Sequence, residues 1–180
     1  MSAQAANATP SPRHVAAVPK ASPLVGKTAP PFALPDPVTG ECVTLDSLLG
    51  KDVLLIFLRG TWCPFCVYQL QVLKGNFEKL RAGNVAVVAI ACQSQITVKL
   101  FLKALPLPYL LLCDGSRTVA KAYGTHYVFS LEGFNLSHPA LFILDKTQTV
   151  TFAHIGRNMS DLPVSRILEK FVALLGDTGV

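Results

Sequence analysis

The feature that most constrains the fold is an apolar run that leads, through a sharp turn, into a helical pattern carrying two cysteines. Residues 53–58 are continuously apolar, and a run this short is typical of a strand buried on both faces of a parallel sheet. Residues 59–61 interrupt the run, and beyond Cys63 apolar residues recur at helical spacing, at Val67, Leu70, Leu73, Phe77 and Leu80. The sequence therefore predicts a strand, a turn and a helix, with Cys63 and Cys66 at the helix N-terminus.

A Cys-x-x-Cys pair at a helix N-terminus is suited to thiol chemistry. The unpaired N–H groups and the dipole of the helix favour the thiolate, which is the reactive form of cysteine. One helical turn brings the two sulfurs within bonding reach, so we expect Cys63 and Cys66 to form a reversible disulfide. In disulfide exchange Cys63 would attack and Cys66 would resolve. With a peroxide as substrate the order reverses, and Cys66 becomes a sulfenic acid that Cys63 resolves.

Two other interpretations of the cysteine pair have to be weighed. A zinc site needs a second Cys or His pair at ligand spacing, whereas Cys42, Cys92 and Cys113 are single and the 4 histidines are not paired in that way. We therefore expect no metal ion, and nothing implies an organic cofactor. The second interpretation, two buried structural cysteines that pack as small hydrophobic residues, remains open. Cys92 and Cys113 end predicted strands at the same edge of the sheet. They are either extra resolving thiols or core residues.

Composition excludes several classes of protein. The chain has 180 residues, 51% of them hydrophobic and 15% charged, which suits a single globular domain. The net charge of +5 is dispersed, without the basic stripe and interleaved aromatics of a nucleic-acid-binding protein. No apolar run is long enough to span a bilayer, so no membrane partner is expected. An odd number of cysteines, 5, not spaced like a secreted disulfide framework, favours a reducing compartment, and we expect the cytoplasm.

The order of the predicted elements indicates an α/β fold. Residues 1–22 are rich in Ala, Ser and Pro and are expected to form a flexible tail, with a transit peptide as the alternative; residues 23–180 form the domain. Residues 30–35 and 41–45 predict a β-hairpin, followed at 46–50 by one helical turn that Asp46 caps. Further strands are expected at 85–92, 109–113, 141–144 and 149–154, helices at 95–105, 114–123 and 162–175, and a loop or insertion at 126–138. This order favours a central mixed sheet with helices on both faces and an N-terminal hairpin extension.

The motifs resemble those of a known family. The stretch Trp62-Cys-Pro-Phe-Cys66, followed by Pro139-Ala-Leu-Phe-Ile-Leu-Asp145, resembles the thioredoxin fold. The wider pattern resembles the alkyl hydroperoxide reductase/thiol-specific antioxidant branch, the peroxiredoxins, in residues 26–32, 57–60 and 122–124. The resemblance implies a thiol-dependent oxidoreductase that cycles between dithiol and disulfide. It also implies a thioredoxin-like or glutathione-like thiol as reductant and a disulfide or a peroxide as substrate.

The chain departs from both parent patterns. Peroxiredoxins resemble one another in Pro-x-x-x-Thr-x-x-Cys and a distant Arg; with Cys66 in the peroxidatic place, those three places hold Arg59, Cys63 and Pro139. Thioredoxins carry a cis proline facing the dithiol in the last of these places, and a buried acid where this chain has Phe57. We therefore expect disulfide exchange as the main activity. Peroxide reduction at Cys66 is the alternative, and a non-catalytic binding module with a decayed site is the third hypothesis.

Three further residues are expected to position the substrate. Trp62 would pack beside the dithiol, unless it is an ordinary core aromatic. Arg59 would lower a thiolate pKa or steer an acidic partner, unless it is a solvated charge in the turn. The peptide bond between His138 and Pro139 is expected to be cis, with the proline ring against the sulfurs, the alternative being a trans proline that opens a strand.

Overall fold

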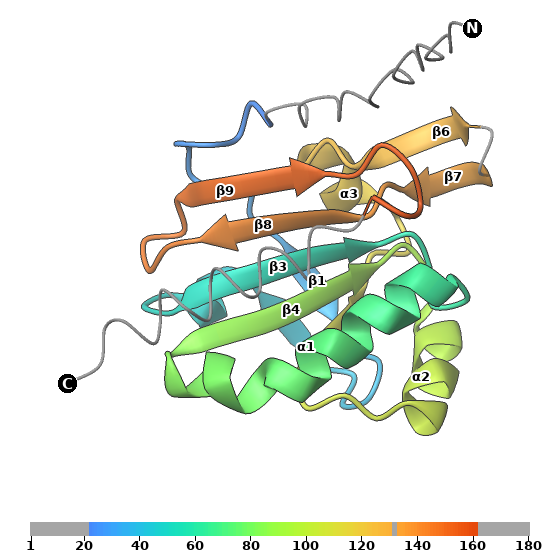
Figure 1. Ribbon diagram of the computed structural model, residues 1–180, viewed down its shortest axis with the longest axis horizontal. Coiled ribbons are helices and arrows are strands. Elements are labelled where there is room, and N and C mark those ends of the chain that lie inside the picture. Colours follow the sequence, from blue (N-terminus) through green and yellow to red (C-terminus); the bar gives the residue numbers. More distant parts are fainter. Residues whose placement is uncertain (1–21, 131–132, 162–180) are drawn as a thin grey trace, which may run out of the picture.

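The computed structural model describes residues 22–130 and 133–161 and is built on a mixed β-sheet (Figure 1). Its 5 strands run in the order β5-β4-β3-β8-β9. The strands are β3 (Asp52–Leu58), β4 (Val85–Ala91), β5 (Leu110–Cys113), β8 (Ala140–Leu144) and β9 (Val150–Ile155). β3 pairs in parallel with β4 and antiparallel with β8, so it lies at the centre with a hydrogen-bonded neighbour on each side.

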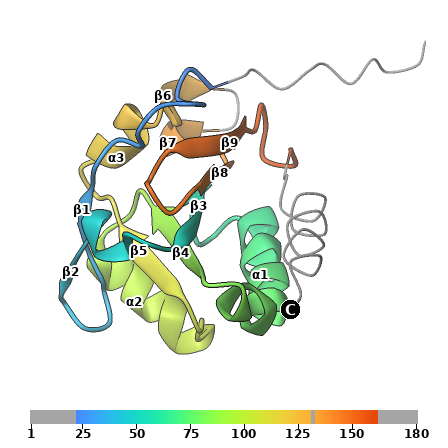
Figure 2. The same ribbon diagram turned by 90° about the vertical axis from the view of Figure 1, so that its left-hand side faces the viewer.

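Other elements cover both faces of the sheet (Figure 2). One face packs against α1 (Pro64–Ala82) and α2 (Gln95–Ala104). The other packs against α3 (Thr118–Ala122), the 3-10 turn η1 (Asp46–Leu48) and the hairpin of β1 (Ala33–Pro35) and β2 (Cys42–Thr44). The expected fold class, a mixed sheet flanked by helices with an N-terminal hairpin, is confirmed.

The side chains of β3 alternate between the two cores, as the period of a strand requires. Leu54, Ile56 and Leu58 join the core under α1 and α2, while Val53, Leu55 and Phe57 join the core under α3. In that second core the ring of Phe57 lies 5.1 Å from the ring of Tyr123 and 5.7 Å from that of Phe142, centroid to centroid. The Tyr123 hydroxyl donates to the Pro30 carbonyl at 2.9 Å, so the cluster also anchors the N-terminal segment.

The predicted strand–turn–helix is present, with Pro64 as the first residue of α1. The later strands of the central sheet and the helix at 95–105 agree with their predicted bounds to within one or two residues. The helix predicted from Asp114 begins only at Thr118. The reason is local: Arg117 adopts a left-handed conformation, and the Asp114 carboxylate accepts from the Ala120 amide at 2.8 Å. In the turn at 46–48, Leu45 occupies the N-cap without a side-chain hydrogen bond, so the expected cap by Asp46 is wrong.

Residues 126–130 and 133–137 form a β-ribbon, so the sequence missed two strands in the segment expected to be a loop or insertion. β6 (His126–Ser130) pairs antiparallel with β7 (Gly133–Ser137). The ribbon projects from the end of the molecule at which β3 enters its turn (Figure 1). It carries exposed apolar side chains, at Val128, Phe129 and Phe134. The apolar side chains of the ribbon are exposed or half-buried, so there is no alternation of buried apolar and exposed polar residues for a sequence pattern to detect.

Two expectations fall outside the described residues. The helix predicted at 162–175 lies beyond residue 161, and the tail at 1–22 lies almost wholly before residue 22. No helix in the described ranges is long and apolar enough to cross a membrane.

The aromatic cluster generates a prediction about stability. Replacing Phe142, which is 0% exposed, by Ala leaves a cavity in the core and should lower the free energy of unfolding by about 3–5 kcal/mol. Urea denaturation followed by circular dichroism measures the change. Phe129→Ala is the matched control, because Phe129 is 78% exposed and should change stability little. An equal loss in both variants would contradict this description of the core.

Candidate active site

The turn between β3 and α1 is held by backbone and side-chain hydrogen bonds. The Cys63 amide donates to the Gly60 carbonyl at 3.2 Å, and the Cys63 carbonyl accepts from the Val67 amide at 3.0 Å, within the first turn of α1. The Thr61 amide donates to the Gln93 side chain at 2.7 Å. Gln93 follows β4, so a residue after the neighbouring parallel strand holds the turn by this hydrogen bond.

The two cysteines of the turn lie side by side inside the protein. Cys63 is 1% and Cys66 0% exposed, and both are free thiols. Cys63 caps α1 in an extended conformation, and its side chain hydrogen-bonds to the Cys66 thiol. They belong to the core under α1, together with Leu58 at the end of β3. The geometry fits a local disulfide, which remains a prediction.

Burial dominates the electrostatics of Cys66. Burial and, second, the neighbouring Cys63 raise the pKa of the Cys66 thiol to about 12. Backbone hydrogen bonds from Gly60 and Arg59 act in the opposite direction, because they stabilise the thiolate. The stabilising effect that the sequence predicts for a helix N-terminus is therefore outweighed at Cys66 by the loss of solvent. At neutral pH this sulfur is a protonated thiol.

Arg59 is buried under Trp62. Its side chain is only 4% exposed, so the alternative of a solvated turn charge is wrong. The guanidinium carbon lies 5.0 Å from the centroid of the Trp62 ring, within the range of a cation–π contact. One terminal nitrogen donates to the Met159 sulfur at 3.7 Å. Among the groups that shift the Cys66 pKa, Arg59 acts through its backbone, so the expected effect of its charge on this thiolate is not supported.

Trp62 is not a core aromatic, because 56% of it is exposed. The indole covers the turn closely: a Cβ built on Gly60 would lie 2.5 Å from Nε1 of Trp62. A real Cβ atom does not lie this close to another side chain, which explains why glycine occupies position 60. Trp62 therefore packs on the backbone beside the cysteines, as a lid over Arg59 and Gly60.

The expectation of a cis bond before Pro139 is wrong, since the described residues contain no cis peptide bond. The reason lies in the hydrogen bonds on both sides of the bond. The His138 amide donates to the Thr125 carbonyl at 2.8 Å, and the Pro139 carbonyl accepts from the Gly156 amide at 2.8 Å. Both residues are thus held in extended chain leading into β8. Ala140 pairs with Phe57, so Pro139 lies at the sheet edge where β3 passes into the turn, and its contact with the sulfurs remains a prediction.

The other cysteines are distributed over both faces. Cys92 belongs to the core under α3 and Cys113 to the core that holds Cys63 and Cys66. Burial raises the pKa of Cys92 to about 12 and that of Cys113 to about 11, which supports the core-packing interpretation. Cys42 is exposed. No group of 3 or more His, Cys, Asp or Glu in the described part of the chain could hold a metal ion.

Sequence reasoning missed three residues around the site. Gln93 had a usable signal, because it directly follows a strand that ends at the active edge. Gln69 also had one, because it is a polar residue on the buried face of a helix, three residues after Cys66. Met159 had none, because it lies 100 residues from Arg59 in the chain.

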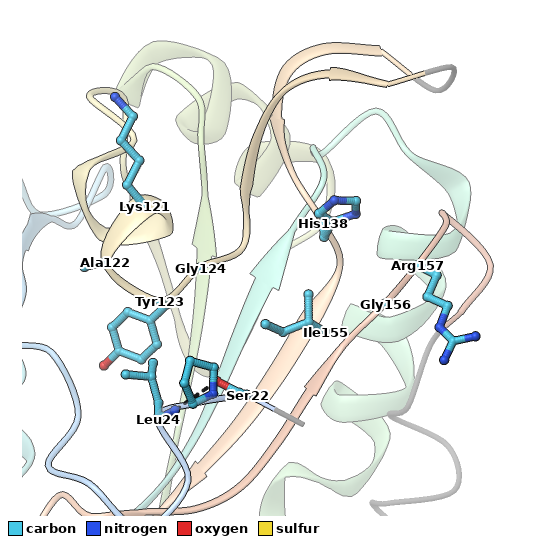
Figure 3. A pocket seen from close by; sticks show the side chains of 11 residues that line it. Ser22, Leu24, Lys121, Ala122, Tyr123, Gly124, His138, Ile155, Gly156 and Arg157 are labelled. Carbon is cyan, nitrogen blue, oxygen red and sulfur yellow. Dashed lines mark hydrogen bonds between the residues drawn. The ribbon is translucent and has the colours of Figure 1, made fainter. Parts of the chain in front are cut away.

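A large pocket lies away from the cysteines. Its volume is about 620 Å³, and Leu24, Tyr123 and Ile155 line it (Figure 3). Lys121 and Arg157 extend on opposite sides of it, and His138, which precedes Pro139, also lines it. Neither Cys63 nor Cys66 contributes to its wall, so the cavity and the dithiol are separate features.

This geometry can be compared with known proteins. A strand, a turn with two buried thiols and a helix on a mixed sheet define a thiol-based redox fold. Residues 25–153 match the model of the AhpC/TSA family, and the chain belongs to this family.

Individual relatives agree with this assignment. The chain is 34% identical over 99 residues to a chloroplastic peroxiredoxin Q of Sedum lineare, covering 55% of this chain and 53% of the relative. It is 34% identical over 100 residues to a putative peroxiredoxin bcp of Coxiella burnetii, covering 56% and 66%. The matches thus span about half to two thirds of the length of these relatives.

Solved structures share the fold. The peroxidoxin BcpB of Mycobacterium tuberculosis superposes with a TM-score of 0.72 at 22% identity, covering 87% of this chain and 98% of that one. A reduced 2-Cys peroxiredoxin of Plasmodium vivax gives a TM-score of 0.70 at 23% identity, covering 86% and 98%. The central sheet and its helices are therefore those of the thioredoxin-fold peroxiredoxins.

The lid over the turn generates a prediction. Gly60→Ala should displace the Trp62 ring from Arg59, because the new Cβ would overlap the indole. We expect destabilisation of about 1–3 kcal/mol in urea denaturation, and Trp62→Ala in the same chain should relieve most of it. Gly75→Ala in α1 is the control: nothing lies within 4 Å of its added Cβ, and a helix-interior Ala should raise stability slightly. A Gly60→Ala chain as stable as the parent would contradict the close contact.

Proposed function

We propose that this protein is a thiol peroxidase in which Cys66 attacks the peroxide and Cys63 resolves the product. The observation that carries the proposal is the pairing of the two buried thiols, with backbone groups of Gly60 and Arg59 hydrogen-bonded to the Cys66 sulfur. Membership of the AhpC/TSA family and similarity to peroxiredoxins Q support it. The trans bond before Pro139 also removes the main argument for a thioredoxin-like mechanism.

The proposed cycle has three steps. The Cys66 thiolate attacks one peroxide oxygen, the O–O bond breaks, and the leaving alkoxide or hydroxide takes up a proton to give an alcohol or water. Cys66 is then a sulfenic acid, oxidised by two electrons. Cys63 attacks the Cys66 sulfur, water leaves, and a disulfide forms. Two thiol groups of a thioredoxin-like or glutathione-like reductant restore the dithiol and leave as a disulfide.

The site supplies only part of the usual stabilisation. Hydrogen bonds from Gly60 and Arg59 favour negative charge on the sulfur, as preorganised donors do. No threonine or arginine stands at the places held by Cys63 and Pro139, where peroxiredoxins polarise the peroxide. Slow turnover with hydrogen peroxide is therefore expected. No metal or organic cofactor takes part in the proposed cycle.

A second candidate function is disulfide exchange, and one observation favours it. The raised pKa of Cys66 suits the buried resolving thiol of a dithiol in which Cys63 attacks. The non-catalytic binding module is the remaining hypothesis, and it predicts that both thiols are inert. A cytoplasmic site of action is part of the proposal, supported by cysteine spacing that does not resemble a secreted framework.

Cysteine variants separate these functions. Cys66→Ser should abolish hydrogen peroxide consumption, because Cys66 is the group that the proposed cycle oxidises. Cys63→Ser should still allow one oxidation per chain but no thiol-dependent turnover. Cys42→Ser is the control, because Cys42 is exposed and lies on β2. Turnover of a protein disulfide is measured in parallel: fast exchange that depends on Cys63, without peroxide consumption, would establish the second candidate instead.

The Cys66 pKa generates a pH prediction. Only the thiolate reacts, and a pKa of about 12 means that the thiolate fraction grows with pH throughout the neutral range. The rate constant for Cys66 oxidation should therefore rise about tenfold for each pH unit between about 7 and 9, since each pKa unit is a factor of ten. Rapid-quench mass spectrometry of the Cys63→Ser chain measures this rate constant. In this variant the Cys66 pKa is lower than in the parent, because Cys63 raises it. A rate that is flat over this range would contradict the buried, protonated thiol.

A further inference from the structure

Gln69 has a buried side chain with no hydrogen-bond partner in the part of the chain that the structure describes. It is 1% exposed, and both its carbonyl oxygen Oε1 and its amide nitrogen Nε2 lack a partner. Buried polar side-chain atoms are nearly always hydrogen-bonded, because leaving water without a partner is costly. An unpaired carboxamide inside a helix–sheet core therefore needs an explanation.

The position of Gln69 on α1 relates it to Cys66. Residues three apart on a helix are neighbours on its surface, and helical side chains lean toward the N-terminus, over the preceding turn. These two rules predict that the side chain of Gln69 extends toward the turn that carries Cys66, which is 0% exposed. The next buried residues of α1, Leu70 and Leu73, offer only apolar side chains.

We propose that Gln69 is the hydrogen-bond partner of the oxygen that Cys66 acquires on oxidation. This inference rests on the proposed function, because it needs a Cys66 sulfenic acid. The step is the one given above: the peroxide O–O bond breaks, an S–O bond forms, the sulfur loses two electrons, and the leaving oxygen takes the proton. A sulfenic acid both accepts and donates a hydrogen bond, and a carboxamide presents a donor and an acceptor together.

The reduced state is consistent with a partner that is absent until oxidation. Neither polar atom of the Gln69 carboxamide has a hydrogen-bond partner among the described residues, so the amide makes no hydrogen bond to the Cys66 thiol. Oxidation adds one bond to the end of the Cys66 side chain and supplies the polar atom that the amide lacks. An unpaired group that is costly in one state and used in the next is typical of a functional site.

The experiment compares Gln69 with a matched glutamine on the same helix. The parent carries Cys63→Ser, so that the sulfenic acid is not consumed by the resolving thiol. Gln69→Met and Gln69→Leu remove the amide at similar volume, and Gln71→Met makes the same change at an exposed position. Hydrogen peroxide is the probe, and peptide mass spectrometry follows the oxygen added to Cys66. The free energy of unfolding is measured for each reduced chain.

The expected result is a rate of Cys66 oxidation at least about tenfold lower in both Gln69 variants, with Gln71→Met unchanged and reduced chains at least as stable as the parent. Oxidation of the Gln69 variants at the parent rate would overturn the inference and leave the proposed function intact. A parent that peroxide does not oxidise at Cys66 would overturn both. Lower stability in both reduced Gln69 variants would reveal a partner in the reduced state and would also overturn the inference.

Discussion

The structure depends on β3 being hydrogen-bonded along both of its edges. β4 pairs with all of β3 from Asp52 to Leu58, and β8 pairs with Val53 to Phe57. The strand therefore cannot shift, and the residue at which it ends is fixed. Because the turn to α1 starts at that residue, the backbone groups of Arg59 and Gly60 and the first turn of the helix have one position. The site is thus a consequence of the central strand.

The same central position sets the chemical character of the cysteines. Cys63 and Cys66 lie on the side of the α1 N-terminus that packs on the sheet, so both are shielded from water, whereas Phe65 in the same turn is exposed. Shielding disfavours the thiolate, while helix geometry and backbone hydrogen bonds favour it. At Cys66 the shielding is the larger effect. Buried, protonated thiols react slowly with oxidants and alkylating agents in the solvent, because the thiolate is the nucleophile.

Local patterns explain how much was predictable from the sequence. The strand at 53–58 and the helix from Pro64 have strong periodicity and clear boundaries, so they agree with the structure. The apolar side chains of the β6–β7 ribbon are exposed or half-buried and create no alternating pattern. The trans bond before Pro139 depends on Thr125 and Gly156, which are distant in sequence. The burial of Arg59 likewise depends on Trp62 and Met159. Contacts between residues of different elements cannot be predicted from the local spacing of residues in the sequence, and such contacts determine most of the site.

The stacking of Trp62 on Arg59 also makes the turn optically readable. The chain contains 1 tryptophan, and its indole lies against a buried cation beside the cysteine pair. All tryptophan fluorescence of this chain thus comes from one ring beside the cysteine pair. Any rearrangement of the turn that moves the guanidinium changes the environment of that ring. The protein therefore has an intrinsic fluorophore at the turn that carries the two cysteines.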